Sequence, residues 1–397
     1  MGGVRTCSLW PNKLESAMNI FEGSILSMIS AECVIIGAGF AGAATAYHLA
    51  RRGVAHVILL EQEAIPGFHS SGRNAAMIRQ CVSEPALFDL TRDGAAFLRS
   101  LPDDWPDPVQ FKQNGSLLLG SADGWKKLQK EAEIARSLGV EVELWTITQA
   151  RRHVAALQDA QFDGAIWCAT DGVVDIHGLL SGYLKYATAH GAKVHFGADV
   201  CAIRRTARGV FELRTKNQMV TTPILINASG AWANIVAQMA GASALPLRPY
   251  RRHLFTSPPL TWVDSRWPFV WDVTHDIYFR PEGEGLLLCA CDQQELAPGD
   301  PPLDPTIGEV LAEKIQRYMP ALEGVSIHKY WAGFRTISSD GHFVIGWDPQ
   351  MEGFFWVAGL GGHGVTTSSA VGALASDLII AGAGKRAEAF SPARFIT

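Results

Sequence analysis

The sequence predicts an α/β protein in which a Rossmann-like dinucleotide-binding domain is joined to a second domain built mainly on an antiparallel sheet. Three features of the 397-residue chain predict this fold class. A glycine-rich turn between a strand and a helix lies near the start, and a second such turn lies near the end. Between them, residues 249–330 combine clustered prolines with short alternating strands. The length allows two domains or one elaborate domain.

The first turn belongs to a strand–helix–strand unit. Residues 32–37 are an apolar run typical of a buried strand, 41–52 give an alanine-rich helix, and 55–60 give a second strand. Residues 84–101 then predict an amphipathic helix. The later elements are expected to be strand–helix–strand at 115–145, helix–strand at 171–200, a hairpin and a buried strand running into a helix at 209–233, a hairpin at 276–290, and strand, glycine-rich loop and long helix at 354–380.

Charge and hydropathy exclude several classes of protein. The formal net charge of −5 gives no electrostatic reason to expect a nucleic-acid partner. The chain has no run of eighteen apolar residues, so no membrane span is predicted. The first 27 residues lack the pattern of a signal peptide, and residues 1–27 are expected to be a disordered leader.

Seven cysteines are scattered along the chain. They form neither a disulfide framework nor a zinc motif, and no metal site is predicted. Cys289 and Cys291 are the only close pair, and on a strand their thiols are expected to point to opposite faces. This cysteine usage predicts a reducing, cytoplasmic location.

The turn after the first strand carries the dinucleotide signature G-x-G-x-x-G, formed by Gly37, Gly39 and Gly42. Such glycines allow a tight turn, a close approach of the backbone to the pyrophosphate, and close packing of helix on strand. The pyrophosphate then lies at the positive end of the helix. Glu61, at the end of the second strand, can accept hydrogen bonds from ribose hydroxyls, and its charge disfavours the 2′-phosphate of NADP.

NAD and FAD both use this unit, and two later segments favour FAD. Residues 356–370 form the second glycine-rich turn, whose donors and helix N-terminus suit the negative charge that reduction places along flavin N1–C2=O. Residues 226–233 form a buried strand that ends in small residues, where the backbone can approach a bulky cofactor. An NAD-dependent dehydrogenase, or a nucleotide-binding subunit without its own chemistry, is the alternative of a different class.

These segments, together with "PGFHSSGRNAA", "DGVVD", "RRHLF", "YFRPE" and "WAGFRT", resemble the FAD-dependent D-amino-acid oxidase/glycine oxidase/sarcosine oxidase family. The resemblance is greatest to the bacterial D-arginine dehydrogenase-like proteins within it and covers essentially residues 30–395. It implies a Rossmann-like FAD-binding domain of the glutathione-reductase type, with the flavin ring between this domain and the antiparallel substrate domain. The implied divisions are 28–110, 165–248 and 331–397 for FAD, and 111–164 and 249–330 for substrate.

The resemblance also assigns cofactor contacts. Glu61 is expected at the adenosine ribose and Val200 at the adenine. Sarcosine oxidases attach flavin through a cysteine after the segment that matches "WAGFRT", and this chain has none there, so non-covalent FAD is expected. The remaining expected contacts are Phe40, Ala41 and Gln62, then Ser70, Ser71, Arg73, Asn74 and Ala75 around the pyrophosphate and ring, Gly230 and Trp232, and Gly361, Gly362, His363, Gly364 and Val365 at the pyrimidine end.

Oxidation of an amine requires mainly that the substrate be held by its carboxylate with Cα–H over flavin N5. A guanidinium suits that task because its fork matches a carboxylate and stays charged when desolvated. Arg335 matches the carboxylate-binding arginine of the family, and Tyr278 matches its hydroxyl partner. Arg251 and Arg252 face opposite sides of a strand, and Arg251 is expected at the substrate, with Arg252 in solvent.

Three more residues are expected at the substrate pocket. Met77 and Val82 stand where D-arginine dehydrogenases carry a histidine and a tyrosine, which suggests a more apolar or roomier pocket. Arg79 matches a carboxylate-binding arginine of the sarcosine oxidases. Two arginines in the pocket favour a dicarboxylate or an opine-like amino acid; a solvated Arg79 is the alternative. His69 and His363 are expected to orient the backbone or flavin rather than act as bases.

The predicted function is oxidation of the Cα–N bond of a D-amino acid or an N-substituted amino acid to an imino acid, by hydride transfer to flavin N5. Oxidation of a 2-hydroxy acid on the same scaffold is the alternative, because a carboxylate anchor and a hydride acceptor serve either reaction. The expected partners are a small amino acid substrate and an electron acceptor, which is oxygen, a quinone or another carrier.

Overall fold

The structure, a computed structural model, describes residues 27–82, 84–382 and 385–396. The predicted leader therefore lies outside the described residues, except for its last residue. Ser27 begins strand β1 (Ser27–Ser30), which pairs in parallel with β13 (Gln218–Thr222). The boundary expected after residue 27 is wrong by one residue, because pairing with β13 begins there.

A six-stranded sheet holds the dinucleotide signature. Its order is β10–β3–β2–β14–β22–β21, and every pairing is parallel except that of β21 with β22. The side chains of β2, β3 and β22 are all buried, as expected for strands covered on both faces. The strands are β2 (Cys33–Ile36), β3 (Val57–Leu60), β10 (Lys193–His195), β14 (Ile224–Asn227), β21 (Val344–Trp347) and β22 (Phe354–Ala358).

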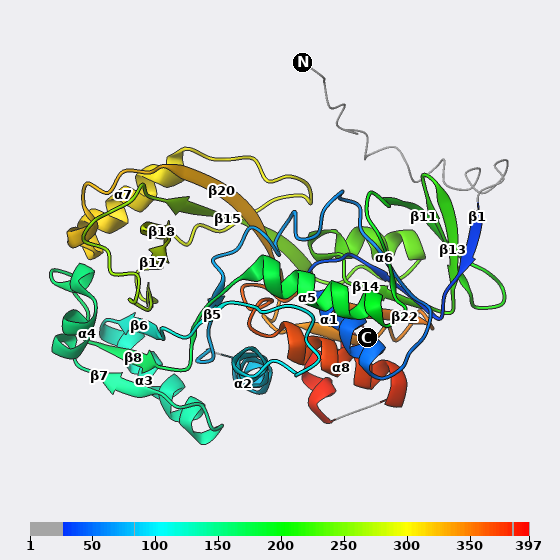
Figure 1. Ribbon diagram of the computed structural model, residues 1–397, viewed down its shortest axis with the longest axis horizontal. Helices are drawn as coiled ribbons and strands as arrows, with labels where there is room; N and C mark the ends of the chain where they lie inside the picture. Colours follow the sequence, from blue (N-terminus) through cyan, green and yellow to red (C-terminus); the bar gives the residue numbers. More distant parts are fainter. Residues whose placement is uncertain (1–26, 83, 383–384, 397) are drawn as a thin grey trace, which may run out of the picture.

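Three helices pack together against this sheet (Figure 1). They are α1 (Phe40–Arg51), α5 (Ile176–Ala189) and α8 (Ser368–Ala381). Helix α6 (Ala233–Ala240) packs with a four-stranded sheet, of order β1–β13–β12–β11, in a second apolar cluster that includes β14 and β22 side chains. The other two strands of that sheet are β11 (Val200–Arg205) and β12 (Phe211–Thr215).

A nine-stranded sheet forms the other part of the molecule, with the order β19–β15–β18–β17–β16–β6–β8–β7 and β20 beside β15. All pairings are antiparallel except that of β16 with β6. The α/β fold class with a mainly antiparallel second sheet is thereby confirmed. The strands are β6 (Ser116–Gly120), β7 (Glu143–Trp145), β8 (Gly164–Cys168), β15 (Leu247–Thr256), β16 (Phe269–Asp272), β17 (Ile277–Glu282), β18 (Gly285–Cys289), β19 (Gln294–Glu295) and β20 (Lys329–Ser338).

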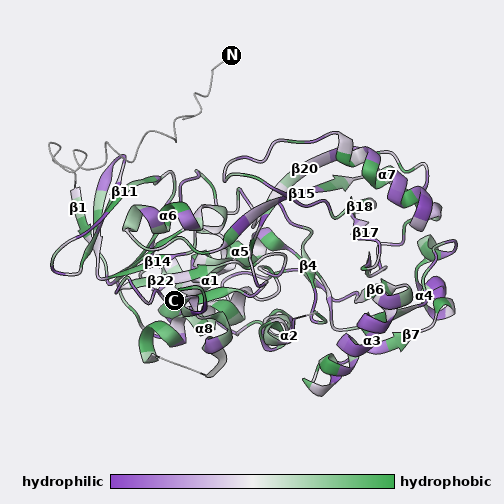
Figure 2. Cartoon of the chain, turned by 180° about the vertical axis from the view of Figure 1, so that it is seen from behind, coloured by the Kyte–Doolittle hydropathy of each residue, from purple (hydrophilic) through white to green (hydrophobic). Residues whose placement is uncertain are grey.

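Helices α3 (Ala122–Ser137), α4 (Ile147–His153) and α7 (Thr306–Tyr318) border the nine-stranded sheet. Figure 2 shows hydrophobic and hydrophilic residues sharing α3 and α7, as expected for helices with one face in solvent. A small sheet of β4 (Met77–Ile78), β9 (Gly172–Val174) and β5 (Phe111–Lys112), with helix α2 (Pro85–Arg99), lies between the two large sheets (Figure 1).

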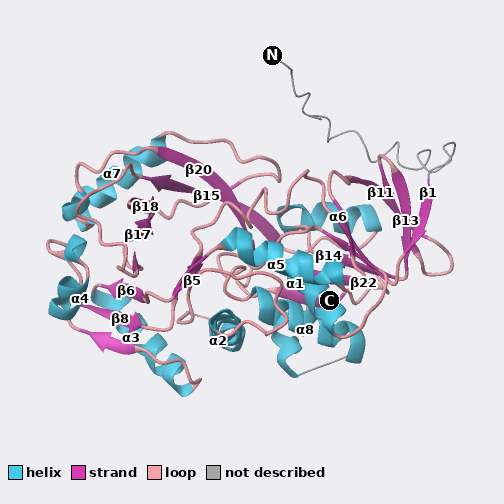
Figure 3. Cartoon of the chain, viewed as in Figure 1, coloured by secondary structure: helices cyan, strands magenta, loops and turns pink. Residues whose placement is uncertain are grey.

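Strands β15 and β20 of the nine-stranded sheet lie side by side and extend toward α5 (Figure 3). The divisions expected at residues 165, 249 and 331 therefore cut strands β8, β15 and β20, each of which pairs within the nine-stranded sheet along its whole length. The divisions implied by the resemblance fall inside these strands, because a strand ends only where its hydrogen-bonded ladder ends.

The six described cysteines are free thiols. The expectation that Cys289 and Cys291 point to opposite faces is wrong. Cys291 lies beyond the end of β18 with φ of +54°, so strand alternation no longer applies to it. Its N–H donates to Cys289 Sγ at 3.2 Å, and both side chains pack in one cluster with Tyr278.

The longest helix in the described part of the chain, α3, has 16 residues. Among the described helices, none combines the length and the apolar character needed to cross a bilayer.

Candidate functional site

A cavity of about 390 Å³ lies between the six-stranded and nine-stranded sheets. Its walls come from the turn after β2, the segment 67–79, the turn after β14, the facing strands β17 and β20, and the loop 359–366. The volume lies within the range of small-molecule sites. Segments that are far apart in the sequence therefore contribute to one continuous site.

Two positions in the turn after β2 and the start of α1 require glycine. Gly37 has φ of +102°, and a Cβ there would lie 2.5 Å from the Ala228 carbonyl oxygen. A Cβ on Gly42 would lie 1.9 Å from the Gly37 carbonyl oxygen. Gly37, Gly39, Phe40 and Ala41 line the cavity. Gly42 does not line it, but its missing side chain lets helix α1 start directly behind the turn.

Glu61 lies at the cavity just after β3, beside Gln62. Its carboxylate accepts the N–H of Ala38 at 2.8 Å and the N–H of Glu63 at 3.0 Å. These bonds fix the carboxylate and leave lone pairs that can accept ribose hydroxyls. Val200, the first residue of β11, lines the same end of the cavity.

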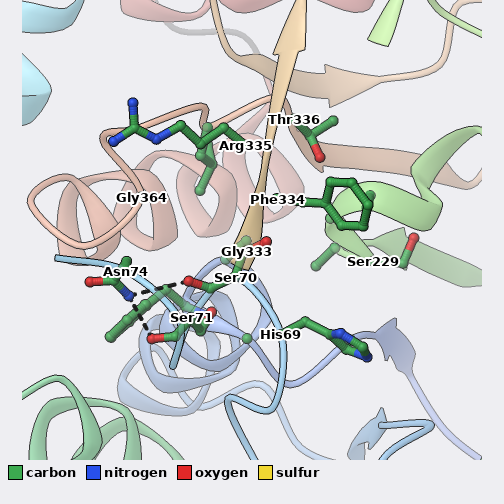
Figure 4. A pocket seen from close by; sticks show the side chains of 18 of the residues that line it. His69, Ser70, Ser71, Asn74, Ser229, Gly333, Phe334, Arg335, Thr336 and Gly364 are labelled. Carbon is green, nitrogen blue, oxygen red and sulfur yellow. Dashed lines mark hydrogen bonds between the residues drawn. The ribbon is translucent and has the colours of Figure 1, made fainter. Parts of the chain in front are cut away.

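The loop that precedes β4 is folded by Asn74 (Figure 4). Its Nδ2 donates to the carbonyl oxygens of Ser70 at 3.2 Å and Ser71 at 2.7 Å, and its Oδ1 accepts the Ala76 N–H at 2.8 Å. Ser71 Oγ in turn accepts the Phe40 N–H at 2.9 Å, which ties the loop to the N-terminus of α1. Ser70, Ser71, Arg73, Asn74 and Ala75 all line the cavity.

Arg73 and His69 occupy the rim near that loop. The Arg73 guanidinium stacks 4.8 Å over the Phe68 ring and pairs with Asp300, so it reaches across to the nine-stranded sheet's connecting loop. His69 Nε2 is 2.8 Å from Glu63 Oε1, and its ring packs on Trp232. His69 Nδ1 is buried and has no partner among the described residues. Gly230 and Trp232 line the same wall.

The second glycine-rich turn closes the opposite end of the cavity, where Gly361, Gly362, His363, Gly364 and Val365 all line it. The Gly361 N–H donates to the Thr336 carbonyl oxygen at 2.9 Å, which joins the turn to β20. Burial, together with Arg79 and Arg335 nearby, lowers the pKa of His363 to about 3. His363 is therefore neutral at physiological pH.

Arg335 and Tyr278 stand on the nine-stranded side of the cavity. Arg335 and Phe334 point to opposite sides of β20 in Figure 4, and Arg335 extends on the side of the Gly364 turn. Burial, and then the charge of Arg252, lowers the pKa of Arg335. Burial and the neighbouring Cys289 raise the pKa of Tyr278, whose hydroxyl has no hydrogen-bond partner among the described residues.

Met77, in β4, and Arg79, the residue after β4, both line the cavity. The Arg79 guanidinium lies 4.5 Å from the centre of the Trp271 ring. Burial lowers the pKa of Arg79, as does the charge of Arg335. Trp271 pairs with Tyr278 across β16 and β17, and its indole Nε1 is a second buried donor without a described partner.

The expectation that Arg251 faces the substrate is wrong, because its neighbour Arg252 takes that place. Arg252 lines the cavity, and its guanidinium donates to the carbonyl oxygens of Cys291 and Asp292 at 3.1 and 3.0 Å. Arg251 bonds to Asp304 at 2.9 Å on the other face. In the β15–β20 register Arg252 pairs with Gly333, on the Arg335 face, whereas Arg251 pairs with Phe334.

Val82 is also absent from the cavity wall. It is buried in the core beside α2. The chain turns away after Arg79, because Gln80 is anchored to Asp171 by its N–H at 3.1 Å and by its side-chain Nε2 at 2.8 Å. Sequence reasoning missed Trp271 at the cavity, because the strand pair that sets it opposite Tyr278 was not predicted from the sequence.

The cavity fits a flavin dinucleotide by its own chemistry. Gly37 and Gly39 leave room for the backbone to approach a pyrophosphate, and α1 begins there. Glu61 suits a ribose, and His69 Nδ1 is an unpartnered polar atom on the wall between. At the far end, the neutral turn 361–365 and the cationic groups suit a ring that gains negative charge when it is reduced.

Comparisons with known proteins agree with this site. A family model described as "DAO: FAD dependent oxidoreductase" matches residues 32–378. The chain is 24% identical over 411 residues to the bovine (Bos taurus) "FAD-dependent oxidoreductase domain-containing protein 1", covering 91% of this chain and 84% of that protein. It is 25% identical over 359 residues to the glycine oxidase of Bacillus subtilis (strain 168), covering 88% of this chain and 93% of that enzyme.

The fold also matches solved structures. The crystal structure of L-proline dehydrogenase from P. horikoshii superimposes with a TM-score of 0.84 and 25% sequence identity. The superposition covers 92% of this chain and 98% of that one.

Proposed function

Since this chain belongs to the DAO family of FAD-dependent oxidoreductases, we propose that it oxidises the Cα–N bond of an amino acid. The product is an imino acid, which water hydrolyses to an oxo acid and an amine. One observation carries the proposal: Arg335 stands at the cavity without a carboxylate partner in the described part of the chain, close to the unpartnered hydroxyl of Tyr278.

An α-carboxylate supplies what this pair lacks. It can accept two parallel N–H bonds from the Arg335 guanidinium and an O–H bond from Tyr278. Because burial raises the pKa of Tyr278, its hydroxyl keeps the proton that it donates. The anchored carboxylate then fixes the substrate so that one face of Cα is presented to the cofactor.

Bound FAD supplies the acceptor for the two electrons that leave with the Cα hydrogen as hydride. The nitrogen lone pair forms the C=N bond, so the amine must first be neutral. The ammonium proton passes to water before the hydride leaves. Burial, with Arg79 and Arg335 nearby, lowers the pKa of His363 to about 3, so His363 is a poor acceptor for that proton.

The names of similar proteins support the reaction class. Glycine oxidase is named for a primary amino acid and L-proline dehydrogenase for a cyclic secondary one. Both names denote amino acid oxidation, which favours an amine over a 2-hydroxy acid as the substrate of this chain. D-amino acids and N-substituted amino acids are the substrate forms we propose.

We also propose a reducing, cytoplasmic location, because the six described cysteines are free thiols.

We propose that FAD is held without a covalent bond. No cysteine lines the cavity within the described residues, and "ISSDGHF" follows the strand segment that carries Arg335. Acid precipitation of the purified protein should release all the flavin into the supernatant. A yellow pellet would contradict this proposal.

The reaction is tested by mixing the holoenzyme anaerobically with single amino acids and with 2-hydroxy acids of the same carbon skeleton. Loss of the visible flavin absorption with an amino acid, and not with its hydroxy analogue, is the expected result. Reduction by hydroxy acids alone would replace this function with 2-hydroxy acid oxidation. Failure of both classes would contradict the proposed function.

A further inference from the structure

Two guanidinium groups at the cavity have no acidic side chain in direct contact within the described residues, although the charges of Glu131 and Asp171 act on Arg79 from farther away. Among the residues that the structure describes, neither Arg79 nor Arg335 forms an ion pair or a side-chain hydrogen bond. Other buried arginines of this region are partnered: Arg251 pairs with Asp304, and Arg280 pairs with Glu282. Arg79 and Arg335 therefore differ from these arginines in having no described partner for their guanidinium groups.

A cation that is withdrawn from water is costly unless an anion or several acceptors compensate it. Arg252, the third arginine on the wall, has such acceptors in two backbone carbonyl oxygens. Arg79 has only the face of Trp271, which attracts the charge but accepts none of the five N–H groups. Within the described residues, the Arg79 side chain therefore has no hydrogen-bond acceptor of its own at the cavity.

The two unpaired cations come from separate parts of the fold. Arg79 follows β4 and is held over Trp271. Arg335 lies on β20, close enough to Gly362 that a Cβ there would lie 3.3 Å from its Cζ. Both depress the pKa of His363, so His363 lies within electrostatic reach of each. One carboxylate on Arg335 and Tyr278 would leave Arg79 uncompensated.

We propose, building on the amino acid oxidation proposed above, that the substrate is a dicarboxylic amine. Arg335 and Tyr278 bind the α-carboxylate next to the oxidised Cα–N bond, and Arg79 binds a second carboxylate. That second group lies on the nitrogen substituent, as in an N-carboxyalkyl amino acid, or on the side chain, as in an acidic amino acid. Met77 and Trp271 form the apolar wall beside it. Arg79 is thus the residue that determines specificity.

Binding of unreactive acids separates the two carboxylate sites. Malonate, succinate and glutarate are titrated into the holoenzyme against acetate, propionate and butyrate, and the dissociation constant is read from the shift of the flavin absorption. The best dicarboxylate should bind at least about tenfold more tightly than the matched monocarboxylate, as expected for one added charge-assisted interaction. Equal affinities would overturn the proposal.

Variants then assign the second site. Arg79→Gln should remove the dicarboxylate preference while changing monocarboxylate affinity by less than about twofold, and Arg79→Met should do the same while keeping an apolar contact with Trp271. Arg335→Gln should weaken both classes. Arg251→Gln removes the same charge outside the cavity and should leave the preference unchanged. A loss of monocarboxylate affinity in Arg79→Gln as large as that of dicarboxylate affinity would mean that both arginines hold one carboxylate, which overturns the proposal.

The rate of flavin reduction by dicarboxylic and monocarboxylic amines tests the second carboxylate separately from the proposed reaction. N-carboxymethyl and N-(1-carboxyethyl) amino acids, aspartate and glutamate are compared with glycine, alanine, sarcosine and proline. Faster reduction by one dicarboxylic group supports the inference and shows which position the second carboxylate takes. Reduction by monocarboxylic amines alone refutes the inference and leaves the proposed function standing. Reduction by none of them refutes both.

Discussion

At the scale of single residues, the charge on Arg335 determines how tightly the substrate is expected to bind. Arg335→Gln removes two charge-assisted hydrogen bonds to the α-carboxylate, each worth about 1.5–3 kcal/mol. The Michaelis constant for the amino acid substrate should rise at least about tenfold. Arg335→Lys keeps the charge without the fork and should recover part of the loss. An unchanged Michaelis constant in Arg335→Gln would remove this residue from the substrate site.

Tyr278 gives a prediction about pH. Its pKa is raised well above the ordinary value by burial and by the nearby Cys289 thiol, so it donates its proton across the range in which amine oxidation is measured. Tyr278→Phe should raise the Michaelis constant about tenfold through the loss of one hydrogen bond to a charged group. In the wild type, substrate affinity should show no loss that is due to Tyr278 ionisation up to about pH 10. An alkaline loss that Tyr278→Phe abolishes would contradict the assigned role.

The residues at the site were partly predictable from the sequence. Most expected cofactor contacts line the cavity, because short motifs fix their local geometry. The choice between Arg251 and Arg252 could not be made, because the face of a strand that meets a cavity depends on pairing with β20. The expectation that Val82 lines the pocket was wrong for a similar reason. Asp171, which is distant in sequence, anchors Gln80, and the chain then turns into the core.

At the scale of elements, the close approach of helix α1 to the turn before it is the feature most sensitive to change. Gly42→Ala would place a Cβ 1.9 Å from the Gly37 carbonyl oxygen, so α1 must move away from the turn. We expect the purified variant to contain much less flavin per protein than the wild type, as measured by the ratio of visible to ultraviolet absorbance. Gly53→Ala is a control, since a Cβ there meets nothing within 4 Å, although its φ of +75° adds backbone strain. Full flavin content in Gly42→Ala would contradict the packing described.

The contact between α1 and α8 makes stability depend on pH. His48 Nε2 lies 3.2 Å from Ser369 Oγ, and burial, then Arg52 and Arg51, lowers the pKa of His48 to about 3 from 6.5. Below pH 6.5 the unfolded chain binds a proton that the folded chain refuses, so the free energy of unfolding falls as the pH falls. The fall is at most about 1.4 kcal/mol per pH unit.

Denaturant unfolding of wild type and His48→Gln at pH 7 and pH 5 tests that linkage. The variant should lose less stability than the wild type between the two values, because its side chain does not titrate. Equal losses would show that His48 contributes nothing to the pH dependence.

The elements themselves were largely predictable where periodicity was strong. The strand–helix–strand unit, the helix α2 and the hairpin of β17 and β18 lie within a few residues of their expected positions. Strand continuity was not predictable: β15 and β20 are ten residues long each, and the expected divisions fell inside them. Local composition changes along such strands, whereas their pairing is decided by the partner strand.

At the scale of the whole molecule, the six-stranded sheet supplies the dinucleotide turn and the nine-stranded sheet supplies the tyrosine and arginines. The cavity lies where the two meet, and Arg73 on its wall forms an ion pair with Asp300, in the loop between β19 and α7. The fold class could be predicted because two glycine-rich turns enclose a region rich in short strands. Arg79 and Arg335 were both expected at the pocket from the sequence, with a solvated Arg79 as the alternative. That neither forms an ion pair with a described acidic side chain could not be predicted, because it depends on the full three-dimensional arrangement.

Anaerobic stopped-flow reduction of the bound flavin shows whether the protein oxidises an amine that is anchored by its carboxylate. Wild type and Arg335→Gln are mixed with increasing concentrations of the amino acid that bleaches the wild type. Reduction should be saturable, with half-saturation in the variant at a concentration at least about tenfold higher. Identical half-saturation in both proteins, or no reduction of the wild type by any amino acid, would contradict this proposal.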